Sequence, residues 1–165
     1  NRFYFVHPDG AVQHYDKKHL FIFGGEHKRF TAGTERVVVN FRGVRILLEV
    51  CYDLRFPVWA RNLGDYDMIL YVASWPTPRV DAWSALLRAR AIENQCYVAG
   101  VNRMGVDPAC EYSGGSAIID PYGKTIAECP WSRESAVSAD IDMEALQAFR
   151  KKFPVLDDAD PFTLI

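Results

Sequence analysis

The 165-residue sequence has little net charge, no long apolar run and only four cysteines. A formal charge of −2 gives no bulk attraction to nucleic acid or to an anionic membrane. No apolar run reaches bilayer length and no signal-peptide pattern is found, so we expect a cytoplasmic protein. Cys51, Cys96, Cys110 and Cys129 form no Cys-x-x-Cys pair and have no zinc-ligand spacing with a histidine. This pattern favours reduced thiols and predicts no metal site.

The sequence also lacks internal repeats, low-complexity tracts and a Gly-x-Gly-x-x-Gly motif after a strand, so no dinucleotide or other cofactor is expected. Hydrophobic residues make up 49% and charged residues 24% of the chain, which is an ordinary globular composition. This length suits one domain. We expect the domain to cover residues 1–153 and an extended tail to cover residues 154–165.

Strand-like and helix-like segments alternate along the chain, which predicts the α/β class. Arg42-Gly43 is a tight turn between two expected strands, and Tyr122-Gly123 closes an expected hairpin. Strands are expected at 3–6, 12–17, 36–41, 44–50, 68–73, 96–102, 114–121, 124–129 and 136–141. Helices are expected from Pro57 to near Gly64, from an Asp81 N-cap to 94, and at 143–152. Arg90 falls on the buried stripe of its helix and needs an acidic partner, for which Glu93 is a candidate.

Cys51 stands where an apolar, branched run ends and just before Pro57, which is typical of a first helical residue. A thiol on a sharp strand-to-helix turn faces helix-end N–H groups, and this is a setting in which a cysteine ionises and becomes a nucleophile. Asp53 and Arg55 follow closely, so a functional interpretation is favoured over a small core hydrophobe.

Four blocks of sequence resemble the motifs of one enzyme family, the nitrilase superfamily of carbon–nitrogen hydrolases. Residues 50–57, Val-Cys-Tyr-Asp-Leu-Arg-Phe-Pro, resemble the family's nucleophile motif. Residues 15–21, Tyr-Asp-Lys-Lys-His-Leu-Phe, resemble its catalytic-lysine motif and are called the lysine block. The segment 89–103 resembles the helix and strand that follow the nucleophile, and Glu26 with Gly33 resembles the supporting glutamate segment. The sequence around Cys51, together with Ser74-Trp75-Pro76, looks most like that of the omega-amidase branch.

The resemblance implies a four-layer α-β-β-α sandwich that pairs into homodimers or higher homo-oligomers. It also implies roles for four residues. Cys51 is the nucleophile, which attacks an amide carbonyl and forms a thioester as ammonia leaves. Lys17 stabilises the oxyanion together with the backbone N–H of Tyr52, and Glu26 orients the lysine or the substrate amide.

The family's catalytic set contains a further glutamate well upstream of the lysine. None of the sixteen residues before Lys17 is a glutamate. The chain also opens inside a strand-like segment and has no initiator methionine. We therefore expect this chain to be the C-terminal part of a longer enzyme, with an N-terminally incomplete fold and without the general base. As an isolated chain it is expected to have reduced or no activity.

The resemblance to omega-amidases implies a small amide substrate, the 2-oxo dicarboxylate monoamides such as 2-oxoglutaramate. Such a substrate carries a carboxylate, which an arginine can bind in a bidentate manner. Arg79 is the first candidate and Arg55 the second, although pairing of Arg55 with Asp53 or another neighbour is expected; Trp75 is expected to form a pocket wall.

Two alternatives remain open at this stage. One is another nitrilase-superfamily enzyme, such as an aliphatic amidase or an N-carbamoyl hydrolase, which only substrate profiling separates from an omega-amidase. The other is a catalytically dead homologue or fragment that acts as a binding module. The missing glutamate favours this second alternative, whereas the intact surroundings of Cys51 and Lys17 argue against it.

Overall fold

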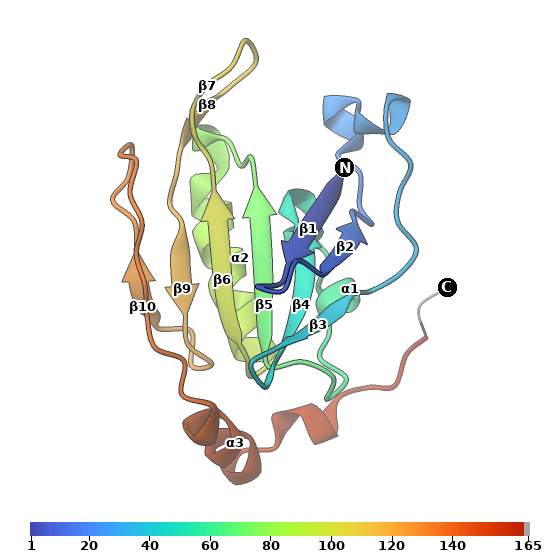
Figure 1. Cartoon of the computed structure of the whole chain (residues 1–165), viewed down its shortest axis with the longest axis vertical. Helices are drawn as coiled ribbons and strands as arrows, with labels where there is room; N and C mark the ends of the chain where they lie inside the picture. The colour runs from blue at the N-terminus through green and yellow to red at the C-terminus, as the bar shows by residue number, and fades with distance from the viewer. Residues whose placement is uncertain (164–165) are drawn as a thin grey trace.

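The computed structural model describes residues 1–163, and its centre is a six-stranded mixed sheet (Figure 1). The three central strands are parallel to one another, and β3 and β9 run antiparallel to their inner neighbours β4 and β6. The sheet has the order β10-β9-β6-β5-β4-β3, formed by Thr125–Glu128, Ala117–Ile119, Tyr97–Asn102, Met68–Ala73, Val44–Val50 and Val38–Phe41.

The central strands form because their branched and apolar residues are covered on both faces. Leu47 of β4 packs on one face with α2 (Val80–Glu93), in a cluster that includes Trp83 and Leu87. Leu48, the next residue, belongs to the cluster on the opposite face. Alternation along β4 therefore supplies both halves of the core, as expected for a central strand of a parallel sheet.

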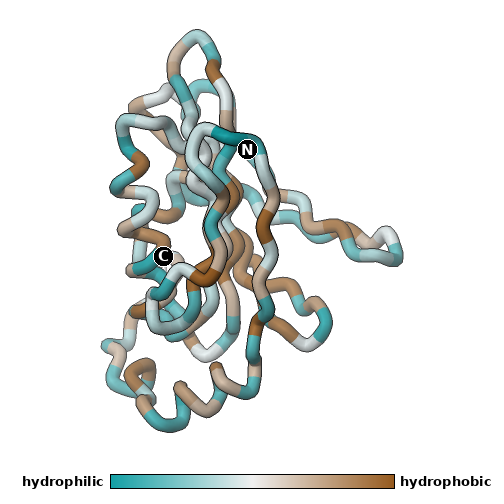
Figure 2. Tube along the Cα trace, turned by 90° about the vertical axis from the view of Figure 1, so that its left-hand side faces the viewer, coloured by the Kyte–Doolittle hydropathy of each residue, from teal (hydrophilic) through white to brown (hydrophobic). Residues whose placement is uncertain are grey.

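The opposite face is covered by a separate hairpin of β1 (Arg2–Val6) and β2 (Val12–Asp16), which crosses in front of the sheet in Figure 1. Its Phe3 and Phe5 pack against the second cluster. Seen from the side, the turns of α2 lie on one side of the strands, and hydrophobic positions concentrate in the strands themselves (Figure 2). The α/β prediction is confirmed, with a helix, the main sheet and a β-hairpin stacked in that order.

The third α-helix, α3 (Met143–Lys152), lies near the amino ends of the parallel strands (Figure 1). Asp142 caps it by accepting a hydrogen bond from the N–H of Ala145 at 2.8 Å. Leu146 is buried in the second cluster, and Arg150 donates to Asp67 Oδ1 at 2.9 Å. The helix predicted at 143–152 is confirmed, and the opposite, carboxyl edge of the sheet is left for the pocket.

Several predicted boundaries were wrong. The segment after Cys51 divides into a 3-10 helix, η3 (Cys51–Arg55), and a single turn, α1 (Pro57–Ala60), which ends before Gly64. Arg79, rather than Asp81, is the N-cap residue of α2. The predicted strand at 136–141 does not form, because these residues lie largely exposed with no partner strand among residues 1–163. The ribbon β7 (Met104–Val106) with β8 (Glu111–Ser113) was not predicted.

Short 3-10 helices connect the larger elements: η1 (Ile22–Gly24), η2 (Glu26–Lys28), η4 (Thr77–Arg79) and η5 (Val155–Asp158). The last of these interrupts the tail predicted to be extended at 154–165, of which Leu164 and Ile165 lie outside the described residues. In the described part of the chain, no helix combines the length and apolarity that crossing a bilayer requires.

Arg90 has the acidic partner that its burial demands. It is 3% exposed and donates to Glu93 Oε1 at 2.8 Å, as predicted, and to the Leu54 carbonyl at 2.6 Å. The fully buried Glu49 of β4 is close enough for its charge to interact with that of Arg90. Burial raises the pKa of Glu49 well above its ordinary value, and the nearby charges of Arg36 and Arg90 oppose that rise.

Candidate active site

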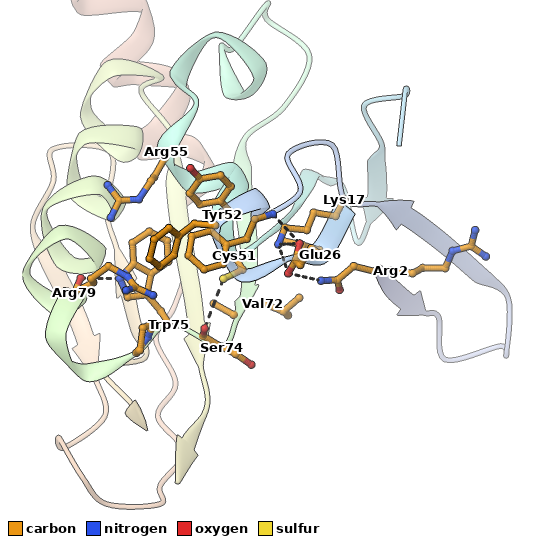
Figure 3. Close-up of a pocket in the computed structure, with 16 residues that line it drawn as sticks. Arg2, Lys17, Glu26, Cys51, Tyr52, Arg55, Val72, Ser74, Trp75 and Arg79 are labelled. Carbon is orange, nitrogen blue, oxygen red and sulfur yellow. Dashed lines mark hydrogen bonds and ion pairs between the residues drawn. The ribbon is translucent and has the colours of Figure 1, made fainter. Parts of the chain in front are cut away.

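A pocket of about 670 Å³ lies at the carboxyl ends of β4 and β5 (Figure 3). This is the edge at which open α/β sheets bind their ligands, because loops there converge from neighbouring strands. All seven residues predicted as catalytic or substrate-binding line this one pocket: Lys17, Glu26, Cys51, Tyr52, Arg55, Trp75 and Arg79. Segments that are far apart in sequence therefore meet as expected.

Cys51 occupies the first position of η3, directly after β4. Its φ of 49° lies in the left-handed region, which is costly for a residue with a side chain and persists only where surrounding contacts hold it. The thiol points to the Ser74 carbonyl, with Sγ 3.8 Å from the oxygen. The strand-to-turn placement predicted for the nucleophile is confirmed.

The structure does not support the ionisation that the sequence predicts for the Cys51 thiol. Burial raises the pKa of the thiol above its ordinary value, and Glu26 and Asp53 act in the same direction. The Lys17 ammonium lowers this pKa but does not overcome the burial. The resting thiol is therefore protonated at neutral pH, because its desolvation outweighs the effect of the nearest positive charge.

Lys17 follows β2 directly and is only 1% exposed. Its Nζ donates to both carboxylate oxygens of Glu26, at 2.9 and 2.7 Å. Glu26 Oε2 also accepts the N–H of Phe21 at 2.9 Å. Burial alone would raise the pKa of Glu26, but these hydrogen bonds hold it below its usual range. The pair is thus an ammonium and a carboxylate, fixed beside the thiol.

Gly33 explains how the backbone of Lys17 is held in place. The Gly33 N–H donates to the Lys17 carbonyl at 2.9 Å. At this position a Cβ would overlap the backbone carbonyl of Asp16. Two backbone segments can approach this closely only because Gly33 has no side chain.

Asp53 is fully buried and accepts four hydrogen bonds from three residues, Tyr15, His19 and Val50. Tyr15 Oη donates to Oδ2 at 2.9 Å, and the Val50 N–H donates to the same oxygen at 3.1 Å. Oδ1 accepts the His19 N–H at 2.8 Å and lies 2.9 Å from His19 Nδ1. The predicted Asp53–Arg55 pair is therefore wrong, because inward-facing donors already saturate the carboxylate.

Arg55 and Arg79 instead flank the pocket through aromatic rings. The Arg55 Cζ lies 5.0 Å from the centre of the Trp75 ring, and the Arg79 Cζ lies 5.5 Å from that of Phe21. Among residues 1–163, neither guanidinium has a carboxylate partner. Figure 3 places both on one side of Cys51, with Lys17 and Glu26 on the other.

Trp75 is the pocket wall that the sequence predicts, since it lines the pocket and is 3% exposed. Its ring Nε1 donates to the Arg79 carbonyl at 2.6 Å. Asn102, at the end of β6, brackets its backbone by accepting the Trp75 N–H at 2.7 Å and donating to its carbonyl at 2.9 Å. The same Asn102 amide donates to the Gly114 carbonyl. Asn102 thus fixes the loop that contains Ser74.

Sequence reasoning missed two features of the site. It assigned no role to Asn102, although this residue lies in one of the four blocks, and none to Phe21, which ends the lysine block and lines the pocket. Tyr52 lies edge-on to Phe21, with ring centres 5.0 Å apart. No cluster of three or more His, Cys, Asp or Glu residues that could hold a metal occurs in the described range.

A protonated thiol, a fixed ammonium–carboxylate pair and two free guanidiniums can together bind an anion and attack an electrophilic carbon beside it. The protein-family model for carbon-nitrogen hydrolases matches residues 1–151 of the chain. The chain is 54% identical over 165 residues to the omega-amidase YafV of Escherichia coli strain K12, covering 99% of this chain and 64% of that protein. It is 40% identical over 161 residues to the 2-oxoglutaramate amidase of Bacillus subtilis strain 168, covering 96% and 62%.

Among solved structures, XC1258 from Xanthomonas campestris is a CN-hydrolase superfamily protein with an arsenic adduct in its active site. It matches this fold with a TM-score of 0.96 at 49% identity, covering 99% of this chain and 65% of that one. Nit3 of Saccharomyces cerevisiae, from the nitrilase superfamily, matches with a TM-score of 0.85 at 26% identity, covering 94% and 58%. The chain spans slightly less than two thirds of the length of these relatives.

Proposed function

The chain belongs to the carbon–nitrogen hydrolase family, and on that premise we propose that it hydrolyses the terminal amide of small 2-oxo dicarboxylate monoamides such as 2-oxoglutaramate. One observation carries this proposal. A thiol beside an ammonium–carboxylate pair shares one pocket with two guanidiniums that lack a carboxylate partner in the described chain. Relatives named for omega-amidase and 2-oxoglutaramate amidase activity support the same substrate class.

In the proposed reaction, Cys51 attacks the amide carbon. A C–S bond forms, the carbonyl π electrons move to oxygen, and the thiol proton is passed on to the leaving nitrogen. Collapse of this tetrahedral species breaks the C–N bond and releases ammonia, which leaves a thioester. Water then adds to the thioester, and the C–S bond breaks. One proton of the water returns to the sulfur to give the free thiol, and the other is released as the new acid ionises to the carboxylate.

The negative charge on the tetrahedral oxygen needs donors that are already in place. Lys17 is such a donor, because burial and two hydrogen bonds to Glu26 leave its ammonium little freedom. The backbone N–H of Tyr52, the residue after the nucleophile, is the second donor that we propose. One oxyanion donor of this kind is typically worth about 3–4 kcal/mol of barrier. Glu26 serves as the orienting partner of Lys17.

The substrate carboxylate is proposed to bind between Arg79 and Arg55. Both guanidiniums already lie over aromatic rings, which limits the conformational entropy lost on binding. Trp75 forms the wall between this end and the thiol. A monoamide of a short dicarboxylic acid has its charge and its amide at opposite ends, which matches the division of the pocket into a guanidinium side and a thiol–ammonium side (Figure 3).

The test is ammonia release from 2-oxoglutaramate by the purified chain, with Cys51→Ala as the control. We expect release by the chain, at the reduced level that its sequence predicts, and none by the variant. Release that persists in Cys51→Ala would contradict the proposed nucleophile. A folded chain that releases no ammonia, while Cys51 still reacts with iodoacetamide, would contradict the proposed activity and favour the alternative of a catalytically dead homologue.

Two further predictions accompany this proposal, namely assembly into a homodimer or larger homo-oligomer and a cytoplasmic location. The outward face of the β1–β2 hairpin supports assembly, because Tyr4, Val6 and Val12 are each more than half exposed. Light scattering coupled to size-exclusion chromatography measures the oligomer directly, and a monomeric mass at micromolar concentration would contradict it.

A further inference from the structure

The nucleophile turn and the lysine strand come from distant parts of the sequence, and a single carboxylate joins them. Tyr15 and His19 lie on either side of Lys17, at alternate positions of the lysine block. Both donate to Asp53, which stands two residues after Cys51. No direct hydrogen bond links Lys17 and Cys51 among the described contacts, so their relative position depends on this bridge.

The bridge is built to be rigid. Asp53 is fully buried, and each of its oxygens accepts two hydrogen bonds. Tyr15 is also fully buried, and its oxygen accepts the N–H of Lys18 and the ring N–H of Trp59, both at 3.1 Å. A network whose members are all satisfied in a low-dielectric interior holds a single geometry.

The bridge also accounts for the strained backbone of Cys51. A left-handed φ persists only where neighbouring contacts over-determine it. Asp53 holds η3 from one side through Val50, Tyr15 and His19. Arg90 holds it from the other through the Leu54 carbonyl. The turn that presents the thiol is therefore fastened to both layers that cover the sheet.

We propose that Asp53 is a positioning residue that fastens the segment carrying Lys17 to the turn carrying Cys51. It does not line the pocket and acts only through these two residues. The effect of Asp53 on turnover rests on the proposed function. Misplacement of a catalytic group by about 1 Å can lower the rate about 100-fold. The effect of Asp53 on the position of Lys17 relative to Cys51 does not depend on turnover and can be measured through the reactivity of the Cys51 thiol alone.

The measurement is the pH dependence of Cys51 alkylation by iodoacetamide, followed on the Cys51 peptide by mass spectrometry so that Cys110 does not interfere. The charged groups facing the thiol are Lys17, Glu26 and Asp53, and Lys17 has the largest effect of the three on its pKa. If Asp53→Asn only removed a nearby negative charge, the alkylation midpoint would fall. If it releases Lys17 from its place, the midpoint rises, which is the expected result.

Tyr15→Phe is the second variant, because it removes one hydrogen bond to Asp53 without changing any charge or much volume. The matched control is Tyr66→Phe, which removes an equally buried hydroxyl that donates to the Ala60 carbonyl, outside the pocket. A midpoint that rises in Asp53→Asn and Tyr15→Phe but not in Tyr66→Phe supports the proposal.

A fall or no change in the folded Asp53→Asn protein would overturn the proposal. If circular dichroism shows that this variant does not fold, Tyr15→Phe decides alone, and an unchanged midpoint there overturns it. Where the unmodified chain hydrolyses 2-oxoglutaramate, both variants should also lose kcat more than they raise KM. Absence of hydrolysis by the unmodified chain would contradict the proposed function and leave the alkylation result valid.

Discussion

Replacement of Arg79 by alanine tests the proposed carboxylate site most directly. The substitution removes the guanidinium that lies over Phe21 but keeps the backbone carbonyl that accepts the Trp75 ring N–H. The Arg79 N–H bond to the Pro76 carbonyl is also kept. The geometry of the Trp75 loop should therefore be kept, and any change in substrate binding should result from the loss of the positive charge and of the guanidinium N–H donors.

The expected magnitude follows from the setting of the side chain. A hydrogen bond to a charged group contributes about 1.5–3 kcal/mol. Arg79 is half-buried and has no competing carboxylate within residues 1–163. The substrate carboxylate therefore does not have to displace an ion pair within the described chain in order to bind Arg79. Since about 1.4 kcal/mol is a factor of ten, KM for the anionic amide should rise about 10- to 100-fold. Arg55 is more exposed, so Arg55→Ala should have a smaller effect.

The assay compares ammonia release from 2-oxoglutaramate with release from a neutral aliphatic amide of similar length. Arg79→Ala should raise KM for the anionic substrate and leave the neutral substrate nearly unaffected, because the lost interaction is uniform binding of the carboxylate. Arg103→Ala is the control, since this arginine also lies over a ring, that of Tyr112, but outside the pocket. Equal losses on both substrates would refute the assigned role.

Three further predictions concern the thiol, the pocket loop and the pH dependence of stability. Because the Lys17 ammonium lowers the pKa of Cys51, Lys17→Met should move the alkylation midpoint of Cys51 to higher pH; an unchanged midpoint would show that the ammonium does not act on the thiol. Asn102→Ala leaves buried backbone groups of the Trp75 loop unsatisfied and should cost about 2–4 kcal/mol in urea unfolding, whereas a cost below about 1 kcal/mol would mean that the loop finds other partners. Burial opposes ionisation of Asp67, but Arg45 and Arg150 lower its pKa below the ordinary value. Its stabilisation is therefore present above the unfolded pKa of about 3.9 and is lost as pH falls through the folded value. The stability gap between wild type and Asp67→Asn should stay constant near neutral pH and narrow only as pH falls below about 4, whereas a gap that does not change with pH would contradict this.

The strands of the core could be predicted because their signal is local. Val44–Val50 and Met68–Ala73 are continuous runs of mainly apolar residues, and the structure buries them on both faces. The segment 136–141, Ala-Val-Ser-Ala-Asp-Ile, was also predicted as a strand but lies largely exposed beside no strand of the described chain. It has fewer apolar residues to bury, and a strand also needs a neighbour with which to exchange hydrogen bonds.

The members of the site could be predicted from short motifs, but their contacts could not. Asp53 lies 38 positions from Tyr15, so nothing near Asp53 in the sequence reveals this partner, and Arg55, two residues after Asp53, was the wrong choice. The raised pKa of Cys51 was likewise out of reach, because it depends on how deeply the folded pocket buries the sulfur. A turn motif indicates which residue is the candidate nucleophile, whereas desolvation of its sulfur depends on how the folded layers pack around it.

Gly33 has a consequence for how this family of sequences can vary. At this position no substitution is small enough, because even the single carbon of alanine would overlap the Asp16 carbonyl, and the displaced strand carries Lys17. A library with every amino acid at every position, selected for amidase activity, should therefore tolerate change at Gly33 as poorly as at Cys51. The two positions would look alike in such a screen, although Cys51 supplies the proposed reacting sulfur and Gly33 supplies only the space that a side chain would fill.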